Sequence, residues 1–178
     1  VVLEGPPRSG KSCLRQMLKD AIKALPEAEA ARIYPYVITA CPDGEGSWFQ
    51  ESAGSDPELA RKLKDDYKSK FTPEYVERVS ANLAACSLPL TFADIGGIPS
   101  PENKQICASA THAVLIVPKE PKDGRPPEEH IAEWLAFNRE LGIKTIAILV
   151  SDYHGGSDTL EGVDAAGILR GSIHHLER

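Results

Sequence analysis

Two glycines, a lysine and a serine stand close together near the start of the chain, within the segment Gly5-Pro6-Pro7-Arg8-Ser9-Gly10-Lys11-Ser12. The segment follows a short apolar run, residues 1–3, and precedes a stretch whose apolar residues recur at helical spacing. Glycines let the backbone curl so that successive N–H groups point inward. A helix that begins near Lys11 directs the positive end of its dipole at the same place. This pattern is typical of a loop that binds phosphate groups.

The segment matches the pattern G-x-x-x-x-G-K-[ST], the P-loop, at every fixed position, and it lies between a predicted strand and a predicted helix as that pattern requires. We expect Lys11 to place its charge near the β- and γ-phosphates of a nucleoside triphosphate and Ser12 Oγ to bind Mg²⁺. Arg8 is expected to contact phosphate or a partner, and the Cys13 side chain to pack against the sheet. The residues of this segment that we expect to bind the nucleotide are Gly5, Arg8, Ser9, Gly10, Lys11, Ser12 and Cys13.

A second acid follows another predicted strand. The apolar run of residues 88–93 ends at Asp94, and a P-loop site that uses magnesium needs an acid of this kind. We expect Asp94 to hold the ion directly or through water; the alternative is a strand-end aspartate that caps a turn. Asp94-Ile95-Gly96-Gly97 also reads as D-x-x-G, which places the N–H of Gly96 or Gly97 toward the γ-phosphate. Lys11 and Asp94 are therefore candidate catalytic residues.

An acidic, glycine-rich loop, residues 41–48, follows the second predicted strand. Asp43 or Glu45 could orient a water or an acceptor hydroxyl as a general base, and Trp48 could stack on a ring. The alternative is an acidic turn with an anchoring tryptophan. Both interpretations stay open on the sequence.

Two further candidates lie in the second half of the chain. Arg125, in a proline-rich loop, could close over the phosphates as a lid arginine or remain a solvated surface residue. Asp152 and Ser151 end the fifth predicted strand, where they could contact the base. The segment Asn103-Lys104-Gln105-Ile106 departs from the guanine-reading pattern N-K-x-D, so ATP is the expected nucleotide by elimination.

Strands and helices alternate along the chain in a way that would position these residues. The expected strands are residues 1–3, 32–40, 88–93, 112–117 and 145–150. The expected helices are residues 11–25, one beginning at 56–57, 72–87, 100–110, 127–141 and a weakly patterned helical ending from 163. The pattern predicts an α/β, three-layer P-loop NTPase fold with a mostly parallel five-stranded sheet and helices on both faces. Ile95 stands where AAA-type ATPases carry a glutamate, so we expect a kinase-like rather than a standard AAA arrangement.

Composition sets the broad class. The 178 residues suit one domain, residues 1–178, and the formal net charge of -6 argues against nonspecific nucleic-acid binding. The four cysteines form no C-x-x-C pair, and no apolar run reaches the length of a membrane span, so we expect a cytoplasmic protein with no membrane partner. The one methionine is Met17. We therefore expect either a domain cut from a longer native chain or a chain whose start is missing.

Four motifs together carry a family resemblance: G-P-P-R-S-G-K-S, C-P-D-G-E-G-S-W, A-D-I-G-G and A-T-H-A-V-L-I-V. The combination resembles the AAA-like P-loop domain fused behind CRISPR-associated ring nucleases. The resemblance implies a prokaryotic antiviral protein whose N-terminal domain degrades cyclic oligoadenylate. It also implies that this domain supports homo-oligomer assembly or regulation through ATP.

Three functions remain open on the sequence. The favoured one is a nucleotide-binding regulatory and oligomerisation module with slow ATP hydrolysis. The second is a kinase-like phosphotransferase that moves the γ-phosphate to a small molecule or nucleotide. The third is an oligonucleotide-binding module that uses Arg8, Trp48 and Arg125, against which the acidic balance of the chain argues.

Overall fold

The structure is a computed structural model that describes residues 1–42 and 71–176. Its strands are β1 (Val2–Glu4), β2 (Tyr36–Ala40), β3 (Thr91–Ile95), β4 (His112–Pro118), β5 (Lys144–Asp152), β6 (Thr159–Val163) and β7 (Leu169–His174). Its helices within the described residues are α1 (Lys11–Lys23), α2 (Glu27–Ile33), α5 (Pro73–Ala85), α6 (Pro101–Cys107) and α7 (Pro127–Leu141). The predicted α/β class is confirmed.

The strands form one sheet in the order β2-β3-β1-β4-β5-β7-β6. Every neighbouring pair is parallel except β6 with β7, which is antiparallel. A mostly parallel sheet was predicted correctly, but the predicted number of five strands is wrong, because seven strands join it in the described residues. Because β3, β1 and β4 are parallel neighbours, their carboxyl ends lie side by side at the same end of the sheet.

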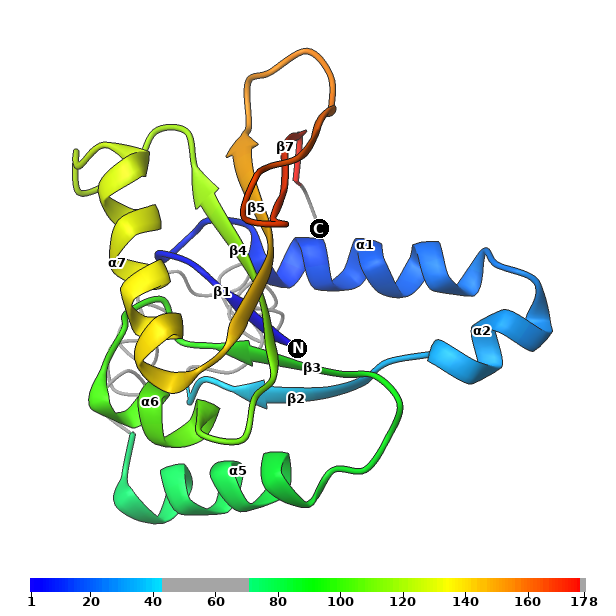
Figure 1. Cartoon of the computed structure of the whole chain (residues 1–178), viewed down its shortest axis with the longest axis vertical. Coiled ribbons are helices and arrows are strands. Elements are labelled where there is room, and N and C mark those ends of the chain that lie inside the picture. Colours follow the sequence, from blue (N-terminus) through cyan, green and yellow to red (C-terminus); the bar gives the residue numbers. More distant parts are fainter. Residues whose placement is uncertain (43–70, 177–178) are drawn as a thin grey trace, which may run out of the picture.

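Helices cover both faces of the sheet, as predicted (Figure 1). Successive residues of a strand point to opposite faces. Val2 therefore joins the core that the sheet shares with α5, α6 and α7, whereas Leu3 faces the other side, where Leu14 of α1 is buried. Only the first part of α1 lies against the sheet, and its second half extends away from the body together with α2 (Figure 1).

The chain after β5 forms a hairpin instead of the helical ending expected from residue 163. β6 and β7 pair around a turn in which Asp164 N–H donates to Ile168 O at 2.9 Å and Gly167 N–H donates to Asp164 O at 2.9 Å. The Asp164 carboxylate also accepts from the N–H groups of Ala166 and Ile168. An aspartate at the start of a turn and a glycine with positive φ at its end favour this hairpin over a helix.

Two other expectations are corrected. Residues 27–33 form helix α2, so the second strand begins at Tyr36 and not at residue 32. Pro26 occupies the N-cap position of this helix. Asp94 lies inside β3 and not after it.

The helix expected near residue 56 lies outside the described residues. No helix among those described is long and apolar enough to cross a membrane.

Candidate phosphate-binding site

The loop between β1 and α1 has the backbone that its two glycines permit. Gly5 has φ of +133°, and a Cβ there would lie 1.9 Å from the carbonyl oxygen of Ile116 in β4. Gly10, the N-cap of α1, has φ of +94°. Both conformations are rare for residues with a side chain. Glycine is therefore required at these two positions by conformation and, at Gly5, also by space.

The N-terminus of α1 is open toward the loop. Gly10 provides no capping side chain, and the carbonyl of Gly10 accepts a hydrogen bond from Leu14 N–H. The N–H groups of the first turn of a helix point out of its end, which here faces the loop. Lys11 Nζ lies over the same loop and donates to the carbonyls of Gly5 at 2.8 Å and Pro6 at 3.1 Å. Ser9 Oγ is buried in the loop and has no hydrogen-bond partner among the residues that the structure describes. These donors fit a phosphate group in the loop.

Ser12 and Asp94 meet beside the loop, as the sequence predicted. Ser12 Oγ donates to Asp94 Oδ2 at 3.0 Å, and Asp94 is only 7% exposed. Magnesium binds hard oxygen donors at about 2.1 Å in octahedral geometry, which places neighbouring ligand atoms about 3 Å apart. The separation of these two oxygens therefore fits two positions on one Mg²⁺ ion. Within residues 1–42 and 71–176, no group of three or more His, Cys, Asp and Glu side chains is placed to hold a metal.

Arg15 is a residue of this site that sequence reasoning missed. It is buried on the sheet face of α1, and its guanidinium donates to Asp94 Oδ2 at 3.3 Å. A buried carboxylate needs such a partner, because an unpaired buried charge is strongly unfavourable. Its position one helical turn after Ser12, among the apolar positions of the helix, was the available signal.

The segment Asp94 to Gly97 reaches the P-loop directly. A Cβ on Gly97 would lie 2.6 Å from the backbone nitrogen of Pro7, so the two backbones are packed against each other. Asn103, which the sequence analysis compared only with a guanine-reading pattern, is buried and holds this segment in place. Its buried amide donates to the carbonyls of Gly96 at 3.2 Å and Ile98 at 2.7 Å.

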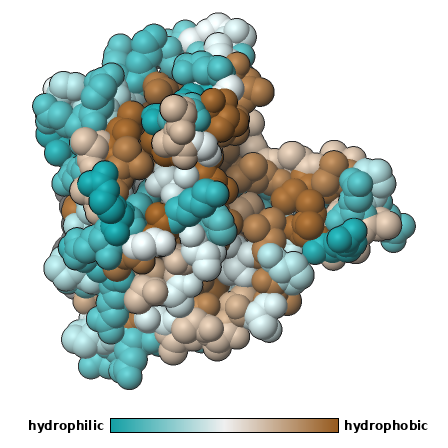
Figure 2. All heavy atoms as spheres, viewed as in Figure 1, coloured by the Kyte–Doolittle hydropathy of each residue, from teal (hydrophilic) through white to brown (hydrophobic). Residues whose placement is uncertain are grey.

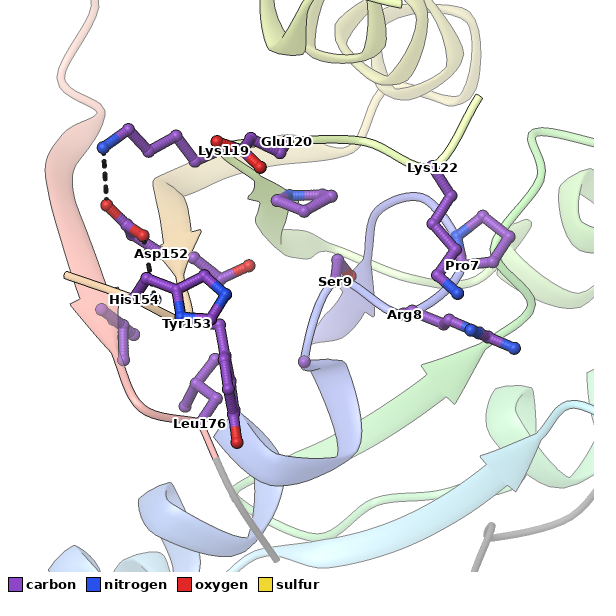
Figure 3. A pocket seen from close by; sticks show the side chains of 14 residues that line it. Pro7, Arg8, Ser9, Lys119, Glu120, Lys122, Asp152, Tyr153, His154 and Leu176 are labelled. Atoms are coloured by element: carbon purple, nitrogen blue, oxygen red, sulfur yellow. Dashed lines mark hydrogen bonds and ion pairs between the residues drawn. The ribbon is translucent and has the colours of Figure 1, made fainter. Parts of the chain in front are cut away.

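A pocket of about 250 Å³ opens beside the loop, at the carboxyl ends of β4 and β5 (Figure 3). It is lined by Arg8, Ser9 and Gly10 of the loop and by Ser151 and Asp152 of β5, as expected from the sequence. In sheets of this kind, ligands bind beyond the carboxyl ends of the strands. Lys119 Nζ lies 2.7 Å from Asp152 Oδ2 and lowers the pKa of that carboxyl below its ordinary value.

Other predicted residues are placed differently or lie outside the described residues. Arg125 does not line the pocket; it pairs with Asp123 at 2.8 Å and with Glu133 at 3.3 Å, next to the buried His130. Its proposed role as a lid stays a prediction. Cys13 is half-buried in α1. Asp43, Glu45 and Trp48 lie outside the described residues, so the phosphotransferase alternative that depends on them stays a prediction.

A buried polar group lies directly behind the loop and was also missed. Glu4, the last residue of β1, is fully buried, and its Oε1 accepts from Asn138 Nδ2 at 2.6 Å. Asn138 Nδ2 also donates to Thr145 Oγ1 at 2.9 Å. Within residues 1–42 and 71–176, Glu4 Oε2 and Asn138 Oδ1 have no hydrogen-bond partner. Burial raises the pKa of the Glu4 carboxyl to about 8. In the sequence, Glu4 directly follows the short apolar run of residues 1–3, and nothing there indicated that its carboxyl would be buried and bound to Asn138.

No protein-family model matches the chain, and a comparison with curated proteins finds no match. The functional argument therefore depends on the geometry of the site.

Proposed function

We propose that this chain binds a nucleoside triphosphate together with magnesium. The phosphates would occupy the loop from Gly5 to Ser12, with Lys11 at the β- and γ-phosphates. Ser12 and Asp94 would hold the ion. The observation that carries the proposal is the contact of these two oxygens at 3.0 Å directly beside the loop, because it joins two motifs that lie 82 residues apart. ATP is the proposed nucleotide, by the elimination argument from the sequence.

We further propose a regulatory and oligomerisation module with slow hydrolysis, on a P-loop fold of the kinase-like class. Ile95, directly after Asp94, is buried in the core and carries no base toward the site. The resemblance to the domain behind CRISPR-associated ring nucleases supports the regulatory role. It would place an N-terminal domain that degrades cyclic oligoadenylate in the same native chain.

An exposed apolar surface supports the oligomerisation role. The second half of α1 and helix α2 form an arm that projects from the body and carries exposed apolar side chains. In Figure 2, hydrophobic residues gather along this projecting arm. The exposed apolar residues of this arm and its junction with β2 are Met17, Leu25, Ile33, Tyr34 and Tyr36. An apolar patch of this kind is typical of a surface that contacts another protein.

Thermal unfolding tests the nucleotide site. The parent and Lys11→Ala are heated with Mg²⁺ plus ATP, GTP, ADP or no nucleotide. A ligand at 100 times its dissociation constant stabilises by about 2.7 kcal/mol, which raises the midpoint by about 5–10 °C in a domain of this size. We expect this rise with ATP in the parent and its loss in Lys11→Ala.

Lys144→Met serves as the matched control, because Lys144 is an exposed lysine at the start of β5, away from the pocket. It should keep the full rise. The proposal would be contradicted if none of the nucleotides raised the melting midpoint of the parent, both in this chain and in the full-length protein.

A further inference from the structure

Arg8 holds a backbone conformation that its side chain disfavours. Its φ is +64°, and among the described residues other than glycine only His175 shares a positive φ. A left-handed backbone is unfavourable for a residue with a Cβ, and such strain gathers at functional sites. Glycine would relieve it. The loop therefore carries an arginine where the backbone alone favours glycine.

The Arg8 side chain and a second cation face the same pocket. Lys122, in the loop after β4, lines the pocket with Arg8. In Figure 3 both charged ends lie at the corner beside Pro7. Both side chains are exposed, and neither forms an ion pair with any residue that the structure describes.

The remaining charged groups of the pocket lie elsewhere. Lys119 is paired with Asp152. This pair lies toward β5, as does Glu120, and all three residues lie away from the corner beside Pro7 (Figure 3). The corner formed by Arg8 and Lys122 therefore carries two positive charges with no acid between them in this view. Such a corner attracts an anion.

We propose that Arg8 and Lys122 form a phosphate-binding pair at the mouth of the loop, outside the nest of backbone N–H groups. The guanidinium and the ammonium donate charge-assisted hydrogen bonds to the oxygens of one phosphate dianion. This inference rests on the proposed nucleotide site. The phosphate is the terminal group of the bound nucleotide or belongs to a second phosphorylated ligand, and the chemistry of recognition is the same for both.

Calorimetric titration with Mg–ATP and Mg–ADP tests the pair, with the parent, Arg8→Gly, Lys122→Met and the control Lys144→Met. If the pair holds the terminal phosphate, Arg8→Gly and Lys122→Met each weaken ATP binding about tenfold and leave ADP binding unchanged. If it holds a second ligand, the parent saturated with Mg–ADP binds inorganic phosphate, and both variants lose that binding. The control should behave as the parent throughout.

The ligand-free melting midpoint of Arg8→Gly shows whether the variant is folded, and it should not fall, because glycine suits the left-handed backbone. Variants that bind ATP, ADP and phosphate as tightly as the parent would overturn the pair while the nucleotide site stands. If the parent binds no nucleotide, the proposed function fails. The pair then stands only if the parent binds inorganic phosphate and both variants lose that binding.

Discussion

Glu4 is an acid in a place that disfavours its charge. It is fully buried behind the P-loop, and one of its oxygens has no hydrogen-bond partner in the described part of the chain. Burial raises the pKa of its carboxyl from 4.5 to about 8 in the folded protein. Between those two values the folded state binds a proton that the unfolded state has released. The contribution of Glu4 to stability is therefore full below about pH 4.5 and is lost as the pH rises through about 8.

Glu4→Gln should remove this dependence. Glutamine keeps an acceptor for Asn138 Nδ2 and adds a donor for Asn138 Oδ1, which accepts from none of the described residues. We expect the variant to exceed the parent in unfolding free energy by about 2–4 kcal/mol at pH 8 and to approach it at pH 5. Urea denaturation across this pH range measures the difference. Glu161→Gln, at an exposed position of β6, is the control, and a constant difference between Glu4→Gln and the parent at all pH values would contradict the expectation.

The sequence could predict only some of the site's residues. Gly5, Gly10, Lys11 and Ser12 follow from local spacing, because a loop, a helix dipole and a phosphate impose that spacing together. Contacts made across the sheet leave no such local pattern. Arg15 contacts Asp94, 79 residues away, and the hydrogen-bond partner of Glu4, Asn138, lies on α7, 134 residues away.

At the scale of elements, the loop after β3 is pressed against the P-loop. Gly97→Ala would place a Cβ 2.6 Å from Pro7 N, so one of the two loops must move. We expect a loss of about 1–3 kcal/mol in stability and a smaller midpoint rise with Mg–ATP than in the parent. Paired melting curves with and without the nucleotide measure both effects.

Gly156→Ala is the matched control for this variant. A Cβ there meets nothing within 4 Å, so the substitution should leave stability and the nucleotide-induced rise unchanged. Equal behaviour of Gly97→Ala and Gly156→Ala would show that the two loops are not coupled.

Elements with a buried face were predictable, and exposed ones were not. Apolar residues recur at strand or helix spacing in β3, β4, β5 and α7, because each of these elements contributes one face to the core. β6 is exposed along most of its length, and α2 buries no residue. Neither element needs an apolar pattern, so no periodicity in the sequence indicated a strand or a helix at these positions.

At the scale of the whole molecule, we expect copies of the protein to assemble through the exposed apolar residues of the projecting arm. Light scattering of the full-length protein should give a mass above that of the monomer with Mg–ATP. Charged substitutions at Ile33 and Tyr34, which are 41% and 43% exposed, should return it to the monomer. Leu160→Glu, at a 75% exposed position on the opposite edge of the sheet, should have no effect. A protein that stays monomeric with and without ATP would contradict the oligomerisation role.

The position of β1 has a consequence for how the chain folds during its synthesis. β1 has three residues and lies between β3 and β4, whose residues follow it by about 90 and 110 positions. β1 is therefore synthesised before either of its neighbours, and it can pair with β3 only after residue 95 and with β4 only after residue 118 has been added. Contacts this distant along the chain form late. The loop of residues 5–12, which follows β1, would therefore take its final shape only when these distant contacts have formed.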